Sequence, residues 1–291
     1  MQSGLLILAL GLLGCALTVA GAWFGRAHPI LDSLGVGLIY GVVVAVGLTV
    51  IFGVLRRWPA AIAGLAIVGA GVAILVPASG DFTTPSMGRI ALLQHNLLFT
   101  NPAPDLLARM ADADVVTLQE VSAATDAIAS LPSDWTVASC VMSPVTATVV
   151  ATRWPVRASG CFEGGTWQRI ETPDGPVTFV SLHLYWPWPK GQTDQVARLE
   201  PDLRALPRPV IVAGDFNQTP WSATAKRITA ATDTRFVPGV RITLNQFSGF
   251  LRIPIDHVLV PRGGSGRAKI AGAHGSDHQM LIALVGPGTD R

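Results

Sequence analysis

Residues able to carry acid–base chemistry follow a short apolar run in the stretch PVIVAGDFNQTP, residues 209–220. An apolar run bounded by glycine and proline is typical of a buried strand. Strand ends are where α/β folds present polar groups to a ligand. We therefore expect Asp215 and Asn217 to be held on a loop by a rigid strand, aimed at one point. The alternative is an Asp/Asn turn that caps a helix beginning near Pro220.

The same placement recurs at the ends of other strand-like runs: Asn96 in IALLQHN, Glu120 in DVVTLQE, His183 in VTFVSLH, Asp256 in IDHVLV, and Asp277 and His278 in GSDHQMLIALV. Each position alone has an ordinary explanation as a turn residue, a strand-end hydrogen-bond donor or a helix cap. Acidic, amide and imidazole side chains at so many strand ends favour a single shared site.

These motifs, in this order, closely resemble the endonuclease/exonuclease/phosphatase superfamily, whose fold is the deoxyribonuclease I-like fold. The resemblance covers residues 88–285 and depends most on GDFN at 214–217, IDH at 255–257 and SDH at 276–278. It implies an α/β fold of mixed α+β layers, a four-layer α/β/β/α sandwich with two packed sheets. The active site would lie at one edge, where the strand-end loops meet.

The resemblance also implies hydrolysis of a phosphate ester. An anionic phosphodiester repels hydroxide, so the reaction needs a hard divalent cation with oxygen ligands, Mg²⁺ or alternatively Mn²⁺. By resemblance Glu120 is the metal ligand, with Asn96 and Asp277 close by.

The resemblance implies catalytic roles for the remaining residues of the set. By resemblance Asp256 orients His278, which acts as the general base or its hydrogen-bond equivalent. Asp215 would position or deprotonate the attacking water. Asn217 would hold a phosphate oxygen, and His183 would donate to the phosphate as charge develops. Whether Asp215 or His278 takes the proton stays open.

One departure from the family concerns His183. Nuclease members often pair this histidine with a glutamate between the LQE and SLH motifs, and the chain has no glutamate between Glu120 and Glu163. Residues 78–291 carry as many basic as acidic residues, because three of the 21 Lys+Arg and one of the 19 Asp+Glu precede residue 78. Both observations argue against a deoxyribonuclease-like use of the site on duplex DNA.

The loop YWPWPKGQ, residues 185–192, follows His183 directly. Trp186, Trp188 and Lys190 could form a substrate rim or reach the membrane interface, where tryptophan is favoured. The alternative is a proline-stiffened loop whose tryptophans cover the core.

The elements that must position these residues interleave strands with helices, which is typical of layers around a sheet core. Strand-like runs lie at 90–93, 115–118, 146–151, 177–182, 210–213, 257–260 and 281–285. Helical spacing of apolar residues appears at 104–111 and 193–206.

The first third of the chain is apolar and nearly uncharged. Three runs, at 4–24, 34–55 and 60–76, approach the ~20 residues that span a bilayer as a helix. A cleaved signal peptide is disfavoured because no Lys or Arg precedes the first run and two more runs follow it. We expect residues 1–77 to anchor the chain in a membrane through three transmembrane helices. Residues 78–87 would be a linker and residues 88–291 a catalytic domain. The whole would be a membrane-anchored, bacterial-type member of the family.

The loop charges orient the anchor. Arg56 and Arg57 lie between the second and third runs, whereas Arg26 is the only arginine between the first and second. The positive-inside rule then places the catalytic domain outside the cytoplasm, on the plasma (inner) membrane; the reversed topology is the alternative. In that compartment Cys140 and Cys161 could form a disulfide, or they could be two separate buried thiols.

The function expected is a membrane-anchored, metal-dependent phosphoesterase. Its substrate would be a nucleic acid, a phospholipid or a small phosphodiester, its second partner is the lipid bilayer, and no protein partner is predicted. A non-catalytic binding module that retains the fold is the first alternative, although no key position is lost. A channel or transporter is the second, although the apolar runs hold no charged pathway.

Overall fold

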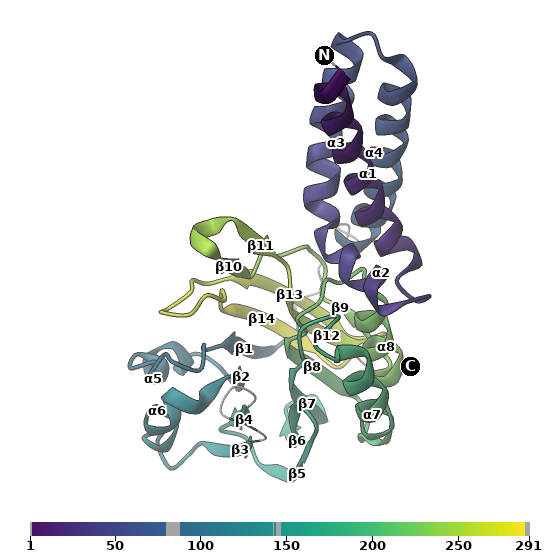
Figure 1. Cartoon of the computed structure of the whole chain (residues 1–291). Helices are drawn as coiled ribbons and strands as arrows, with labels where there is room; N and C mark the ends of the chain where they lie inside the picture. The colour runs from purple at the N-terminus through teal and green to yellow at the C-terminus, as the bar shows by residue number, and fades with distance from the viewer. Residues whose placement is uncertain (1, 80–87, 142, 144–146, 289–291) are drawn as a thin grey trace.

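The structure is a computed structural model that describes residues 2–79, 88–141, 143 and 147–288. Residues 80–87 of the expected linker lie outside the described part. Figure 1 shows a long helical bundle standing on one side of a layered domain.

Three helices of the bundle are long and apolar enough to cross a membrane, and their spans are Ser3–Phe24, Pro29–Val54 and Trp58–Ala78. The prediction of three apolar spans is confirmed, with longer bounds for the second and third. The elements are α1 (Gln2–Phe24), α2 (Pro29–Leu34), η1 (Gly35–Gly37), α3 (Leu38–Val54) and α4 (Trp58–Ser79). α4 begins at Trp58 and includes Pro59 in its first turn. Proline is tolerated there because the N–H that it lacks would have no helical partner in the first turn.

The layered domain contains two six-stranded sheets, with the order β13-β14-β1-β2-β4-β3 in one and β5-β6-β7-β8-β12-β9 in the other. The first sheet comprises β1 (Ile90–Asn96), β2 (Val115–Gln119), β3 (Thr136–Cys140), β4 (Thr148–Thr152), β13 (Ser265–Ile270) and β14 (Leu281–Gly286). The second comprises β5 (Val156–Phe162), β6 (Gly165–Thr172), β7 (Gly175–His183), β8 (Val210–Asp215), β9 (Thr234–Phe236) and β12 (Asp256–Pro261).

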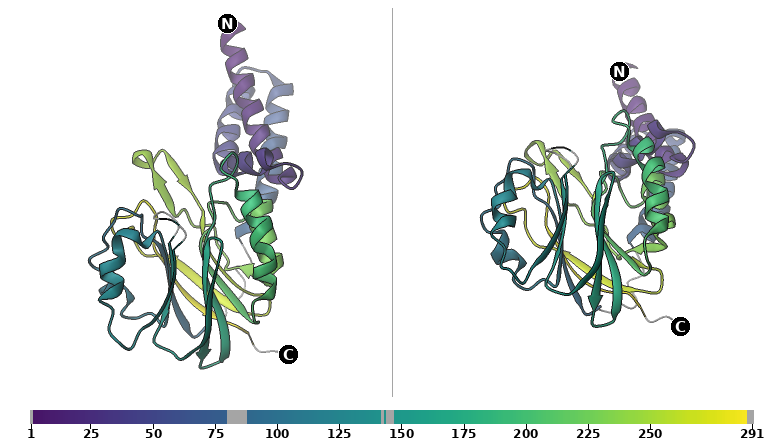
Figure 2. Two further views of the ribbon diagram at one scale, coloured as in Figure 1. Left: turned by 60° about the horizontal axis from the view of Figure 1, so that its bottom comes forward. Right: turned by 90° about the horizontal axis from the view of Figure 1, so that it is seen from below.

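Apolar side chains fill three successive interfaces between four layers. Between the sheets pack residues such as Leu92, Val115, Phe179 and Ile211. On the outer face of the first sheet lie α5 (Leu106–Met110), η2 (Val121–Ala124) and α6 (Thr125–Ala129). On the outer face of the second lie α7 (Gln192–Ala205) and α8 (Ala223–Thr232). The four-layer α/β/β/α sandwich is therefore confirmed, and the two views of Figure 2 show the helices outside the paired sheets.

All seven strand-like runs of the sequence are strands (β1, β2, β4, β7, β8, β12 and β14), and both helical patterns are helices (α5 and α7). Apart from β6, which lies between β5 and β7, the strands without a sequence prediction lie at sheet edges or in the hairpin of β10 (Leu244–Gln246), η3 (Phe247–Gly249) and β11 (Leu251–Ile253). Edge strands are half-solvated, as the mostly exposed residues of β5 show, so their sequences lack a continuous apolar run.

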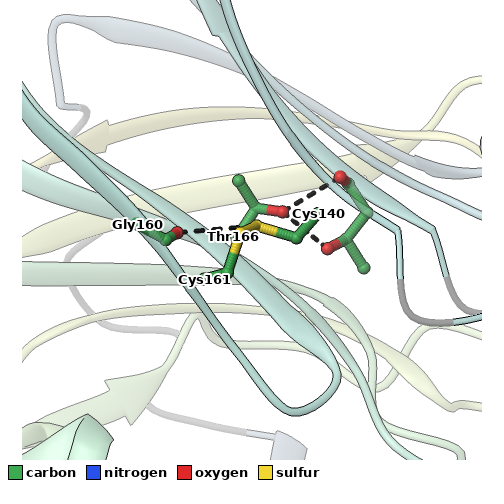
Figure 3. The surroundings of a disulfide bond; sticks show 5 residues. Cys140, Gly160, Cys161 and Thr166 are labelled. Carbon is green, nitrogen blue, oxygen red and sulfur yellow. Dashed lines mark hydrogen bonds between the residues drawn. A yellow bond between two sulfur atoms is a disulfide. The ribbon is translucent and has the colours of Figure 1, made fainter.

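The cysteines of the layered domain are paired. Cys140 at the end of β3 and Cys161 in β5 form a disulfide with a Cα–Cα distance of 5.7 Å, which confirms the first of the two sequence alternatives (Figure 3). β3 and β5 are edge strands of different sheets, so the bond joins the two sheets at one side. Beside it Thr148 and Thr166 share a hydrogen bond of 2.7 Å between their hydroxyls, again from one sheet to the other.

Candidate active site

Strand pairing brings the predicted site residues to one edge of the two sheets. In the first sheet β1 and β2 run parallel, so Asn96 at the end of β1 lies close to Glu120, which follows β2. In the second sheet β7 runs parallel to β8, with His183 opposite Asp215. Asp215 also lies opposite Asp256, the first residue of antiparallel β12. Side chains from segments far apart in the chain thus converge.

Asp256 and His278 form the predicted dyad. Nδ1 of His278 donates to Oδ2 of Asp256 at 2.8 Å, and both residues are buried. Gln94 Nε2 donates to the other oxygen of Asp256 at 3.1 Å, and Thr243 Oγ1 accepts from its backbone N–H at 3.0 Å. Burial disfavours the imidazolium, but the carboxylates of Asp256 and Asp215 outweigh it and raise the pKa of His278 to about 10. His278 is thereby held as a cation.

Asp215 is the centre of the hydrogen-bond network. Its Oδ1 accepts from the backbone N–H of Asn217 at 2.8 Å, and its Oδ2 accepts from Nδ2 of Asn96 at 3.0 Å. The same Oδ2 lies 3.8 Å from Nε2 of His278. Burial raises the pKa of Asp215 to about 8, although the positive charge of His278 opposes the rise. A carboxylate with such a pKa is suited to accept a proton near neutral pH.

Glu120 occupies a left-handed backbone position (φ 55°) directly after β2, which turns its side chain back over the strand end. Its Oε1 accepts from Nδ2 of Asn96 at 3.1 Å, and its Oε2 accepts from the N–H of Phe99 at 3.0 Å. Burial raises the pKa of the Glu120 carboxyl despite these donors. The cost of burying this carboxylate is what a bound cation would relieve.

The residues present fit a divalent cation. Donor atoms of Glu120, His183 and Asp215 lie within 4.8 Å of one another. This group differs from the predicted ligand set, which placed Asn96 and Asp277 beside Glu120. Oδ1 of Asp277 is nevertheless buried and has no hydrogen-bond partner among the described residues. Oxygen donors left over in this way, together with a buried glutamate, are typical of a hard-cation site.

His183 lies between the two halves of the site. Its Nε2 is 3.7 Å from Glu120 Oε1 and 3.6 Å from Asp215 Oδ2. Its Nδ1 is buried without a hydrogen-bond partner in the described ranges, which agrees with the glutamate missing from the sequence. Burial, assisted by the charge of His278, lowers the pKa of His183 to about 4. A neutral ring is thus present here, beside the cationic ring of His278.

The remaining predicted residues lie around this network. Nδ2 of Asn217 donates to the carbonyl of Leu184 at 2.8 Å, and its Oδ1 is buried without a partner among the described residues. Trp186 and Trp188 are 39% and 54% exposed, and Lys190 is exposed as well. These exposures favour a rim over the alternative in which the tryptophans cover the core.

The sequence did not predict several residues that support the site. Gln94 donates to Asp256 from within β1, whose only predicted site residue was Asn96. Gln246 donates to Asp277 at 2.6 Å from β10, a strand with no sequence prediction. Ser276 Oγ donates to the carbonyl of Asn96 at 2.8 Å and so joins the last loop to β1. The SDH motif contains Ser276, which was the available signal for it.

Comparisons with known proteins bear on the family and the fold of the chain. The sequence model described as the Endonuclease/Exonuclease/phosphatase family matches residues 93–278. No curated protein matches the chain.

Among solved structures, an endonuclease/exonuclease/phosphatase family protein from Leptotrichia buccalis is 13% identical with a TM-score of 0.55, covering 68% of this chain and 99% of its own. TDP2 from D. rerio, complexed with a single-strand DNA product, is 16% identical with a TM-score of 0.55, covering 68% and 98%. Beta toxin from Staphylococcus aureus with bound magnesium ions is 12% identical with a TM-score of 0.52, covering 67% and 99%. These likenesses show the fold, and the match over residues 93–278 shows that the chain belongs to the endonuclease/exonuclease/phosphatase family.

Proposed function

We propose that the chain is a membrane-anchored, divalent-metal-dependent phosphoesterase whose catalytic domain faces outside the cytoplasm. The observation that carries the proposal is the convergence of Asp215, the Asp256–His278 dyad and Glu120 in one buried hydrogen-bond network at a single sheet edge. A binding module has no need for a buried cation held between two carboxylates, because such a group is costly to bury.

Glu120, with Asn96 and Asp277 beside it, would hold Mg²⁺ or Mn²⁺. A cation there would supply electrostatic stabilisation to the negative phosphate. Asn96 already orients Glu120 and Asp215 through its amide Nδ2, which donates to both carboxylates. Its position ties the metal-binding half of the site to the catalytic half.

Asp215 takes the proton of the attacking water in this proposal. Its Oδ2 faces His183, His278 and Asn96, and its other oxygen is bound by the N–H of Asn217, so its orientation is fixed. The water oxygen bonds to phosphorus, an ester P–O bond breaks, and the leaving oxygen is protonated from solvent or a neighbouring acid.

The other polar groups of the site stabilise charge. The His278 imidazolium, oriented by Asp256, stabilises charge that develops on the phosphate. Asn217 and His183 would contact phosphate oxygens.

The test uses the purified full chain in detergent with bis-p-nitrophenyl phosphate. Turnover should require Mg²⁺ or Mn²⁺ and stop with EDTA, and His278→Ala and Asp215→Asn should each lower it by about 10²-fold or more. His274→Ala is the matched control, because this histidine pairs with Asp105 away from the network. Metal-independent turnover, or none in a folded protein, would refute the proposal and favour a binding module.

The topology is tested separately by cysteine labelling. A membrane-impermeant maleimide should label Ser130→Cys in intact cells, because Ser130 is an exposed residue of the catalytic domain. Leu55→Cys, in the connection between α3 and α4, should be labelled only after lysis. The reverse pattern would place the catalytic domain in the cytoplasm.

A further inference from the structure

Direct contacts attach the catalytic domain to the helical bundle through the segment that follows the site residue Asn217. Asp32 of α2 is 5% exposed and accepts from the backbone N–H groups of Ala223 and Thr224 at 2.7 and 3.1 Å. Trp221, only 2% exposed, donates from its indole to the carbonyl of Gly35 at 2.7 Å. These contacts involve residues that follow Asn217 by only a few positions, so the bundle holds the loop that leaves the site.

A second attachment is made by the hairpin of β10, η3 and β11. The hydroxyl of Tyr40, near the start of the membrane-spanning helix α3, donates to the carbonyl of Arg252 at 3.0 Å and accepts from its N–H at 2.6 Å. The hairpin also contacts the site, since the N–H of Asn245 donates to the carbonyl of Asp277 at 2.9 Å. Figure 1 shows the hairpin at the level of the lower end of the bundle.

The depth of the hairpin in the membrane follows from its contact with Tyr40 of α3. η1 and α3 together provide the ~20 residues that cross a hydrocarbon core, so Tyr40, in the first turn of α3, would lie ~8 Å inside the edge of that core at Gly35. Interfacial aromatic side chains reach a comparable depth. Phe247 and Phe250, at the tip of the hairpin, are 73% and 85% exposed. Exposed phenylalanines at that depth would lie in the interfacial region of the bilayer.

Exposed aromatic side chains of the catalytic domain lie on loops that follow site-bearing strands and on the hairpin. Among described residues 88–288, the exposed large aromatic side chains are Phe99, Trp186, Trp188, Phe247 and Phe250, of which the last two are the most exposed. Phe99 follows β1, the two tryptophans follow β7, and the other two cap the hairpin, so all five lie on loops that border the site. Both views of Figure 2 place the hairpin on the side of the domain that carries the bundle.

We infer that the active site works on the membrane in which the chain is anchored, and that its substrate is the phosphate ester of a membrane lipid. This inference rests on the proposed phosphoesterase function. Single-stranded nucleic acid also stacks on aromatic rings, but it needs a positively charged groove, and residues 78–291 carry no excess of basic side chains. Exposed aromatic side chains on the loops near the site, two of them on a hairpin bound to a spanning helix, match the lipid interface instead.

The first experiment measures depth without using activity. The full chain is reconstituted in vesicles of phosphatidylcholine and phosphatidylglycerol, with Phe250→Cys carrying an environment-sensitive fluorophore in a Cys15→Ala background. Brominated lipids should quench this label at least twofold more than the same label at Leu284→Cys, an exposed position on β14 that pairs with Ala91 near the opposite end of β1. Equal quenching at the two positions would overturn the placement.

The second experiment compares substrates with the same preparation. Vesicle phospholipid should be hydrolysed, and the double variant Phe247→Ser/Phe250→Ser should lower that rate at least tenfold while turnover of bis-p-nitrophenyl phosphate stays within twofold. Leu284→Ser should change neither rate.

Each other outcome has a defined meaning. Turnover of the soluble ester with no lipid hydrolysis, or a preference for a single-stranded oligonucleotide, would overturn the inference and leave the phosphoesterase standing. An equal loss on both substrates in the double variant would assign the hairpin a structural role and also overturn the inference. No turnover of any substrate would refute the phosphoesterase itself, and the depth measurement would still decide where the hairpin lies.

Discussion

Among single residues, the surroundings of each histidine decide its charge. His95, His183 and His257 are buried, and burial lowers the pKa of each to about 4. His278 is equally buried, but the carboxylates facing it outweigh burial and raise its pKa. The same side chain therefore serves as a neutral packing or binding group at three positions and as a cation at one.

His257, which is not one of the proposed catalytic residues, tests whether burial keeps a histidine neutral. Its Nε2 donates to the carbonyl of Gln218 at 2.8 Å, and its ring packs edge-on against Phe216 and Phe236. Because the folded-state pKa lies below the ordinary value of 6.5, the unfolded chain binds the extra proton first as the pH falls. Stability is thus unaffected above pH 6.5 and decreases between pH 6.5 and 4, by up to ~3 kcal/mol for this residue.

The variant His257→Gln should show a shallower decrease of the thermal midpoint over that pH range than the unchanged protein. His274→Gln, which alters an exposed histidine, should keep the original slope. Identical slopes for all three proteins would show that His257 is not held neutral.

Glu120 allows a test of the metal site. Glu120→Gln keeps the size of the side chain and its hydrogen-bonding oxygen but removes the negative charge, so we expect the Mg²⁺ concentration for half-maximal turnover to rise at least tenfold. Glu200→Gln is the matched control, since Glu200 of α7 pairs with Arg227 of α8 on the outer face of the second sheet. An unchanged Mg²⁺ requirement in Glu120→Gln would remove Glu120 from the ligand set.

Among the secondary-structure elements, α8 owes its start to two separate segments. Ser222 caps it from within the domain by accepting from the N–H of Ala225 at 2.9 Å. Asp32, almost 200 positions earlier in the chain, accepts from the first two helical N–H groups and from the hydroxyl of Thr224 at 2.8 Å. A helix N-terminus favours a carboxylate, because unpaired N–H groups and the helix dipole are both positive there.

Replacing Asp32 tests whether the anchor is part of the folded catalytic unit. Asp32→Ala leaves two buried or half-buried N–H groups of α8 without an acceptor, so we expect a loss of about 3 kcal/mol. Asp32→Asn, which keeps one acceptor oxygen, should lose less. Thermal unfolding of the full chain in detergent measures both.

Asp194→Ala is the control, because Asp194 is an exposed acid in the first turn of α7. We also expect Asp32→Ala to lower phosphoesterase turnover, because the loop from Gln218 to Ser222 follows Asn217 directly. A variant as stable as the unchanged protein would mean that the anchor and the domain are only loosely associated.

On the scale of the whole molecule, the disulfide and the bundle restrain the sandwich from two directions. The Cys140–Cys161 bond joins the edge strands of the two sheets, and the bundle holds the loops at the site. A disulfide persists in an oxidising compartment, which supports a catalytic domain outside the cytoplasm.

Removing the disulfide should cost about 3 kcal/mol, the value expected for closing a loop of this length in the unfolded chain. The double variant Cys140→Ser/Cys161→Ser should unfold at a lower temperature than the unchanged protein, and reductant should lower the midpoint of the latter only. Cys15→Ser, which changes the free cysteine of α1, should respond to reductant like the unchanged protein. A midpoint insensitive to reductant would show that the bond does not form.

The sequence alone determined the three apolar spans, the central strands and the polar residues at their ends. Each of these features is local: a long uncharged apolar run forms a helix apolar enough to cross a membrane, and a short apolar run that ends at a glycine and an acid forms a buried strand with a polar end. Asp215, Glu120 and His278 could be named because their motifs adjoin such runs.

Tertiary structure alone decided how the separate runs meet. The roles of Asp32 and Tyr40 depend on partners nearly 200 and more than 200 positions away, and no local periodicity encodes such contacts. The edge strands likewise form only because a neighbouring strand supplies hydrogen-bond partners for half-solvated backbone. The attachment of the hairpin that carries Phe247 and Phe250 to α3 has the same origin, since it requires both the fold of the domain and its contact with the helices.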